Sequence, residues 1–208
     1  VKKLQGYILK TQKVRDEDLI VTILTQNEQI SLYRFFGVRH SILTVGYKID
    51  FEVELTDNSA TKRLRRVTEL YANWQNDFEK LLYWQKYIQL LYQHLHGISD
   101  IDSFYFEHLE EVSNVLKRQN IKRSLINGYL KLLHFEGRLT EPKYCFLCDT
   151  PLGLDCTLTR AFLPTHFHCH YGRKIASQNI VLMMQTQKCL HLDTPVIEEL
   201  WNLINEGL

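Results

Sequence analysis

The chain has 208 residues, of which 45% are hydrophobic and 12% aromatic, which is typical of a folded globular protein and excludes a disordered one. The formal net charge is +1, but residues 1–66 carry 12 Lys and Arg against 8 Asp and Glu, so any polyanionic partner is expected on this part. The sequence has no run of 18 apolar residues and no signal-peptide pattern at its start. We therefore expect a cytoplasmic protein without a membrane span.

The first part of the chain has the pattern of short β-strands. In Lys48–Leu55 apolar residues alternate strictly with charged ones, as in a strand with one buried face. Asp18–Thr25 is rich in β-branched residues and apolar on both faces, which is typical of a central strand. Leu4–Val14 and Ile30–Val38 are the further strand candidates. Four or five short strands joined by polar loops predict a small closed or nearly closed barrel.

The pattern then changes to a helical period. From Val67 to Gly97 apolar residues recur every three or four positions, which predicts a long helix or a helix pair. Similar stripes cover Tyr105–Leu116 and Ile121–Leu133, and Gly137 ends the latter. A last helix is predicted to begin at Thr194–Pro195, a cap followed by proline. The stripes predict the core of a helical bundle.

An irregular segment rich in cysteine and histidine interrupts the helices. Cys145-x-x-Cys148 is a turn in which two thiolates can reach one tetrahedral zinc ion. His166-x-x-Cys169 follows after a gap within the range of two-pair zinc sites. Four protein ligands would close the coordination shell, so we expect a structural zinc and not a catalytic one. The preferred ligands are Cys145, Cys148, His166 and Cys169, with Cys156, His168 and His170 as alternatives.

A zinc-dependent nucleic-acid enzyme is the alternative from another class. Zinc nucleobase deaminases combine H-x-E with a downstream C-x-x-C, and His134-Phe135-Glu136 precedes the Cys145 turn here. His134 lies at the end of a predicted helix, too close to Cys145 for the strand and turn that such a site needs. Glu110 and Glu111 are expected on a solvated helix face. No other catalytic motif is recognisable, so we expect a protein that is not an enzyme.

Basic and aromatic residues gather at the end of the third predicted strand. Aromatic rings offer stacking surfaces to unpaired bases, and nearby cations bind phosphates without encoding sequence. Strand alternation puts Tyr33 and Phe35 opposite Arg34 and Phe36, so at least one of these sets is expected in the core. The predicted DNA-binding residues are Lys10, Lys13, Arg15, Arg34, Arg39, His40, Lys62, Arg63, Arg65 and Arg66.

Three stretches carry a resemblance to a known family. Gly6–Thr25 reads as a strand, a polar loop with acidic residues and a second strand ending in Thr; Gly37–Ser41 reads GVRHS; Leu132–Cys148 combines a helix end, glycine, proline and C-x-x-C. In this order they resemble the RecO family of bacterial recombination mediator proteins. The likeness spans nearly the full chain. It departs from the family's commoner pattern of two C-x-x-C pairs, because His166-x-x-Cys169 stands where the second pair is expected.

The resemblance implies an α+β protein: an OB-fold β-barrel at residues 1–66, then a helical domain at 67–208 with a zinc-ribbon-like insertion at about 142–171. It implies a recombination mediator in DNA repair that binds single- and double-stranded DNA without sequence specificity and anneals strands. With RecR, such a protein helps load RecA on DNA coated by single-strand-binding protein, whose acidic tail it contacts. A bacterial, nucleoid-associated location follows. A protein-interaction adaptor that recognises acidic tails is the second alternative.

Overall fold

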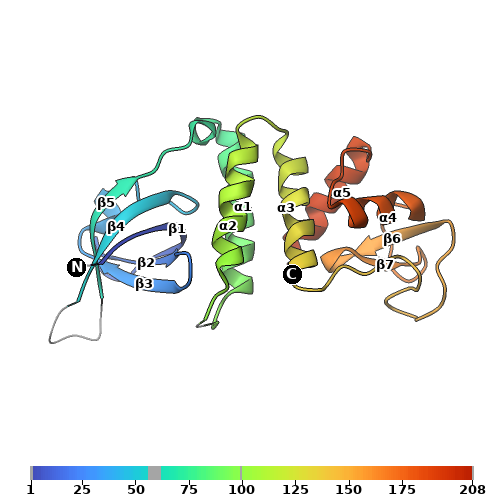
Figure 1. The fold of residues 1–208 in the computed structure, drawn as a ribbon, viewed down its shortest axis with the longest axis horizontal. Helices are drawn as coiled ribbons and strands as arrows, with labels where there is room; N and C mark the ends of the chain where they lie inside the picture. Colours follow the sequence, from blue (N-terminus) through green and yellow to red (C-terminus); the bar gives the residue numbers. More distant parts are fainter. Residues whose placement is uncertain (1, 56–61, 99, 208) are drawn as a thin grey trace. The chain divides into compact units, whose positions relative to one another are not determined.

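The computed structural model describes residues 2–55, 62–98 and 100–207. The chain divides into two compact units, Val1–Lys117 and Arg118–Leu208. The first unit contains a β-barrel and two helices, and the second contains three helices and a small sheet (Figure 1). The predicted boundary after residue 66 falls inside the last barrel strand, β5 (Arg63–Glu69), and the division into two domains stays a prediction. No helix of the described residues is both long and apolar enough to cross a bilayer.

Five strands close the barrel in the order β1-β2-β3-β5-β4, with β4 paired back to β1. All neighbours are antiparallel except β3 and β5, which are parallel at Tyr33 and Arg63. This arrangement is OB-like and confirms the predicted α+β fold with an N-terminal barrel. The strands are β1 Lys2–Lys13, β2 Leu19–Leu24, β3 Gln29–Arg34, β4 Lys48–Glu54 and β5 Arg63–Glu69.

The barrel encloses its own apolar core. In β4 alternate side chains, Ile49, Phe51 and Val53, are buried, which confirms the pattern seen in the sequence. In β2 the side chains of Val21 and Ile23 are fully buried. These residues belong to one buried cluster that all five strands help to form. Removal of this apolar surface from water stabilises the barrel.

The helical stripe predicted from Val67 was wrong at its start. Val67 lies in β5, and the first long helix, α1 (Phe78–His94), begins eleven positions later. The three- and four-residue spacing of apolar side chains from Val67 to Trp74 imitates a helix, but β5 pairs with β4 as far as Glu69, and only a 3₁₀ helix, Asn73–Asn76, lies between β5 and α1. Arg66 has a φ of 42° beside an irregularity in the β4–β5 register, so the strand bends there.

Two helices of the first unit pack near the barrel, α1 and α2 (Ser103–Leu116). The indole N–H of Trp84 in α1 donates to the carbonyl oxygen of Gly46 at 2.8 Å. Gly46 has a φ of 88°, and a Cβ there would lie 2.7 Å from the Trp84 ring. Only glycine permits this approach, so the loop before β4 is held directly against α1.

The second unit combines helices with a three-stranded sheet in the order β7-β6-β8. The Tyr129 ring in α3 packs edge-on against Phe162 with centroids 5.0 Å apart, and its hydroxyl donates to the Gly207 carbonyl at 3.1 Å. The irregular segment predicted between helices has no α-helix among its described residues but contains two short strands, β6 and β7, joined by a 3₁₀ helix at Arg160–Phe162. The elements are α3 Ile121–Phe135, β6 Asp155–Thr159, β7 Leu163–Thr165, β8 Ile175–Ala176, α4 Ser177–Thr186 and α5 Thr194–Asn205.

Candidate metal centre and basic–aromatic surface

Two turns of the second unit bring four metal-ligating side chains together. One ligand atom from each of Cys145, Cys148, His166 and Cys169 lies within 4.8 Å of the other three. In the first turn the Asp149 N–H donates to the Cys145 carbonyl at 2.9 Å, and in the second the Cys169 N–H donates to the His166 carbonyl at 3.0 Å. Each pair of ligands is thus fixed locally by a tight turn, as its spacing in the sequence indicates.

Contacts between the turns set the distance from one ligand pair to the other. The Phe146 N–H donates to the Pro164 carbonyl at 2.8 Å, and the His166 N–H points to Cys145 Sγ at 3.4 Å. Behind them, the hydroxyls of Thr157 in β6 and Thr165 in β7 hydrogen-bond at 2.8 Å, and both residues are fully buried. The β6–β7 pair therefore holds the second turn beside the first. Sequence reasoning missed these two threonines, because no ligand spacing marks them.

The thiols of the cluster differ in acidity. Burial raises the pKa of Cys145, but backbone N–H groups of His166, Leu147 and Cys148 outweigh it and lower that pKa to about 6. A hydrogen bond with the Thr150 hydroxyl lowers the pKa of Cys148. Burial and the two neighbouring thiols raise the pKa of Cys169 to about 11. Hydrogen bonds, from backbone N–H groups at Cys145 and with the Thr150 hydroxyl at Cys148, thus stabilise thiolate at two of the three sulfur atoms, which is the form that binds metals.

The donor set fits a metal ion. Three sulfur atoms and one imidazole nitrogen are ligands that tetrahedral zinc accepts in proteins. No second group of three or more such side chains was found in the part of the chain that the structure describes. The alternative ligands lie outside the cluster: Cys156 is buried in β6, and His168 stacks on the His166 ring with centroids 4.9 Å apart. His170 is also outside it.

A second candidate site lies where β3 ends. The Arg34 guanidinium donates to the Leu64 carbonyl at 3.0 Å and lies 3.2 Å from the His40 imidazole. The guanidinium carbon of Arg63 lies 5.1 Å from the centroid of the Phe35 ring, and that of Arg39 lies 5.2 Å from the Phe36 ring. We call this group the basic–aromatic surface; it consists of Arg34, Phe35, Phe36, Arg39, His40 and Arg63.

The expectation that one aromatic set lies in the core was wrong. The Phe35 side chain is 40% exposed, Phe36 is 55% exposed, and Tyr33 is half-buried. Alternation fails because β3 ends at Arg34 and Phe36 adopts a left-handed φ of 52°. The Asp18 carboxylate holds this turn, since it accepts the Phe36 N–H at 2.9 Å and the Tyr33 hydroxyl. The hydrogen bond from Tyr33 lowers the pKa of Asp18.

The predicted DNA-binding cations fall into distinct groups. Three belong to the basic–aromatic surface together with His40, and burial, followed by the charge of Arg65, lowers the pKa of Arg34. Lys10 lies away from this group, with its ammonium 5.0 Å from the Tyr92 ring of α1. Lys13, Arg15 and Lys62 are exposed. Three cations have acidic partners: Arg39 with Glu17 at 2.6 Å, Arg65 with Glu54 at 2.9 Å and Arg66 with Glu52 at 3.3 Å.

These exposed pairs leave the surface available to phosphate. An exposed ion pair in proteins contributes about 0–1 kcal/mol, so a polyanion competes with it easily. Arg63 instead packs against an aromatic ring, and Arg34 is crowded by a like charge. A phosphate near these two guanidinium groups would meet donors that are already positioned, with a ring beside them.

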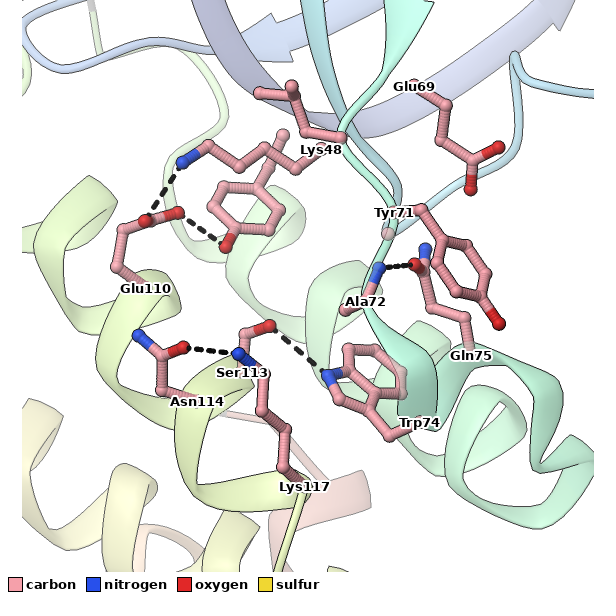
Figure 2. Close-up of a pocket in the computed structure, with 13 residues that line it drawn as sticks. Lys48, Glu69, Tyr71, Ala72, Trp74, Gln75, Glu110, Ser113, Asn114 and Lys117 are labelled. Carbon is pink, nitrogen blue, oxygen red and sulfur yellow. Dashed lines mark hydrogen bonds and ion pairs between the residues drawn. The ribbon is translucent and has the colours of Figure 1, made fainter.

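A cavity of about 480 Å³ lies between the barrel and the helices of the first unit. Figure 2 shows Lys48 and Glu110 pointing toward each other; the ammonium donates to the carboxylate at 2.9 Å, and the Tyr7 hydroxyl donates to it at 2.6 Å. Glu110 is therefore not on a solvated face as expected, since α2 uses it to hold β1 and β4. Across the cavity, the Trp74 indole donates to the Ser113 hydroxyl at 3.3 Å (Figure 2). These contacts explain why the compact unit extends to Lys117.

The molecule thus belongs to the α+β proteins that combine an OB-like barrel with a Cys and His cluster suited to a metal ion. Residues 4–75 match the family described as RecO N terminal. This match covers the N-terminal part of the chain; it confirms the resemblance to the RecO family and supports a role in recombination and DNA repair. DNA and the recombination machinery are the partners that such a family implies. No curated protein matches the chain significantly.

Proposed function

We propose that this protein is a non-enzymatic recombination mediator that binds single- and double-stranded DNA through the basic–aromatic surface. The observation that carries the proposal is the position of that surface on the barrel that matches the RecO N-terminal family. Its guanidinium groups neutralise phosphates of any sequence, and the exposed rings of Phe35 and Phe36 stack on unpaired bases. Annealing follows because the cations reduce the repulsion between two complementary strands.

The proposal includes a structural zinc ion held by Cys145, Cys148, His166 and Cys169. The set of three thiols and one imidazole supports it, because four protein ligands complete a tetrahedral shell and leave no position for a reactive water. The ion would supply a cross-link between the two turns. Absence of an open coordination position also favours the non-enzymatic role over a zinc-dependent nucleic-acid enzyme.

We further propose, as the family implies, that the protein acts with RecR to load RecA on DNA coated by single-strand-binding protein, whose acidic tail it contacts. The helical part and the metal-holding segment are assigned to protein partners in this scheme. Its bacterial, cytoplasmic and nucleoid-associated location belongs to the same proposal. Binding of purified RecR and of an acidic-tail peptide to the full chain tests the two contacts separately.

Fluorescence anisotropy with labelled single-stranded DNA over a salt series tests DNA binding. We expect the logarithm of the binding constant to fall linearly with the logarithm of the salt concentration, because bound cations release counterions from DNA. Replacement by Ala of Arg63, which belongs to the basic–aromatic surface, and of Lys62, Arg65 and Arg66, which lie beside it in or next to β5, should weaken binding. The salt slope should flatten by about one for each phosphate that the variant no longer binds.

The matched control removes four exposed cations outside the barrel: Lys86, Lys117, Arg118 and Lys188, each replaced by Ala. It changes the net charge equally and should leave most of the affinity and slope intact. Equal losses in both variants would reduce the effect to net charge and contradict a localised site. A wild-type chain that fails to bind DNA at low salt would contradict the proposed function itself.

A further inference from the structure

The two metal-holding turns carry exposed aromatic rings that the metal does not require. Phe146 lies between the cysteines of the first turn and is 61% exposed, and Phe167 lies between His166 and Cys169 and is 42% exposed. A ligand turn needs its backbone N–H groups for the sulfur atoms, whereas the side chains at its tip are free to vary. Phenylalanine at both tips exposes apolar surface to water, which is unfavourable and does not stabilise the fold. Because the four ligand atoms lie within 4.8 Å of one another, the two turns that carry these rings are neighbours.

Cations and a further ring surround the second tip. The Tyr171 ring is 79% exposed and meets the Phe167 ring edge-on, with centroids 5.3 Å apart. The Lys174 ammonium lies 4.7 Å from the centroid of the Phe167 ring. His168 and Arg173 are exposed beside them. We call this group the knuckle patch; it consists of Phe146, Phe167, His168, Tyr171, Arg173 and Lys174.

The charge of this stretch selects the kind of partner. Residues 166–176 contain one Arg, one Lys and three His but no Asp or Glu. Acidic side chains lie nearby as well: a Glu199 carboxylate oxygen accepts the Arg173 N–H at 3.0 Å, Asp155 pairs with Ala176, and Asp149 directly follows Cys148. Flat apolar faces with adjacent cations match the bases and phosphates of a single strand, in which the bases are free to stack. A purely apolar protein partner would gain nothing from the Lys174 and Arg173 charges.

We propose that the knuckle patch is a second binding site for single-stranded DNA, in which bases stack on Phe146, Phe167 and Tyr171 while Lys174 contacts a phosphate. The inference rests on the proposed function, since it takes DNA as the polyanion, but it assigns a separate site in the second unit. One chain then has two surfaces that each hold a strand. A duplex offers no unpaired base face to the patch, so this site prefers single strands.

Photocrosslinking on the full, zinc-loaded chain tests the site directly. The probe is an oligo-dT strand in which some bases are 5-iodouracil, which crosslinks to aromatic side chains on irradiation. We expect crosslinks on the peptides that contain Phe146, Phe167 and Tyr171, in addition to those at Phe35 and Phe36. Crosslinks confined to the barrel would overturn the inference.

A variant separates stacking from charge. Phe146→Leu, Phe167→Leu and Tyr171→Leu together keep apolar side chains but remove the rings, and affinity for oligo-dT should fall about tenfold for each base that no longer stacks. Affinity for an abasic strand of the same length should not change, because it has phosphates without bases. Zinc content and circular dichroism verify that the variant is folded. Phe78→Leu is the control, since this ring is 78% exposed, like that of Tyr171, but lies on α1.

The outcomes distinguish this inference from the proposed function. If wild type binds single strands and the triple variant binds them equally well, the knuckle patch is not a DNA site while the barrel site stands. If the variant loses RecR binding but keeps its affinity for oligo-dT, the patch is a protein surface and the inference is overturned. If wild type binds no DNA at low salt, the proposed function fails and the inference fails with it. Selective loss of oligo-dT binding supports the inference.

Discussion

The barrel and the segment that carries the Cys and His cluster, residues 143–174, are both small β-structures, but different interactions stabilise their folds. In the barrel, side chains such as Ile8, Val21 and Phe51 are fully buried inside five paired strands. In the segment around the two turns, the rings of Phe146 and Tyr171 face solvent, and only short strands pair. Hydrophobic burial stabilises the barrel, whereas in our proposal a metal ion bound by the four ligands adds a cross-link to the segment.

The comparison also explains why both regions can display aromatic rings. A ring that points outward contributes little to the core, so another force must fix the backbone beneath it. The Asp18 carboxylate does so for Phe36, and backbone hydrogen bonds of the two turns, with the proposed metal ion, do so for Phe146 and Phe167. Each region thus has a support that can be removed without touching the displayed ring.

Removal of the proposed metal ion should produce the largest difference in stability between the barrel and the segment around the two turns. Structural zinc contributes about 10–16 kcal/mol of binding free energy in zinc-finger peptides at pH 7, and that energy is folding energy. We expect chelation or Cys145→Ser to abolish amide-exchange protection in residues 143–174 while β1 to β5 stay protected. Hydrogen-exchange mass spectrometry measures both regions at once.

The control for this experiment is Cys156→Ser. Cys156 is buried in β6 but lies outside the cluster, so this variant should keep one zinc ion per chain while Cys145→Ser loses it. Metal analysis of the purified variants provides the readout. Unchanged protection of residues 143–174 in a metal-free chain would show that the segment does not need a metal.

Truncation of a side chain in the barrel core should destabilise the barrel and leave the segment around the two turns intact. Phe51 is fully buried, and Phe51→Ala should lower the free energy of unfolding of the barrel by about 3–5 kcal/mol, through reduced burial and a cavity. Zinc content should remain the same. Phe78→Ala, at an exposed ring, should change stability by less than about 0.5 kcal/mol. Urea denaturation followed by hydrogen exchange of β1 to β5 measures the effect, and a decrease no larger than that of the control would contradict the assignment.

The sequence predicts most of the barrel because one-sided burial leaves a period of two. The alternation in β4 is an example, since each buried residue is followed by a charged one. The period of two does not predict β5, because Arg65 and Arg66 are exposed and only Leu64 is fully buried in this strand. Its strand conformation comes from pairing with the preceding strand β4 and, at Arg63, with β3, which is distant in the sequence. A local pattern does not contain that information.

The metal cluster is predictable for a related reason. Cys145-x-x-Cys148 and His166-x-x-Cys169 are local turns, and local spacing is visible in a sequence. The selection of His166 over His168 depends on the β6–β7 pair, which turns one imidazole toward the thiols. The exposure of Phe35 and Phe36 was not predictable, because it depends on where β3 ends and on a hydrogen bond to Asp18.

Loss of the hydrogen bonds that join the barrel to α2 through Glu110 should have an intermediate effect on stability. Glu110→Ala leaves the partly buried Lys48 ammonium and Tyr7 hydroxyl without their acceptor, which should cost about 1–3 kcal/mol of stability. Glu107→Ala, at an exposed carboxylate of the same helix, should cost less than about 0.5 kcal/mol. A double-mutant cycle with Tyr7→Phe tests the coupling, and additive effects in urea denaturation would contradict the network.

The smallest expected change in stability concerns the replacement of Phe36 itself. Its left-handed φ of 52° is disfavoured for a side chain with a bulky ring, whereas asparagine enters this region more readily. Phe36→Asn should therefore leave the barrel as stable as before or more stable by about 0.5–1 kcal/mol, while binding of single-stranded DNA becomes weaker. Phe35→Asn lacks this relief and removes the ring that packs against Tyr33 and Arg63, so it should be destabilising. Thermal denaturation and anisotropy on both variants make the comparison. A strained ring whose removal stabilises the fold but weakens binding is maintained for binding, whereas a Phe36→Asn variant that is less stable and binds DNA normally would assign Phe36 to the structure of the turn alone.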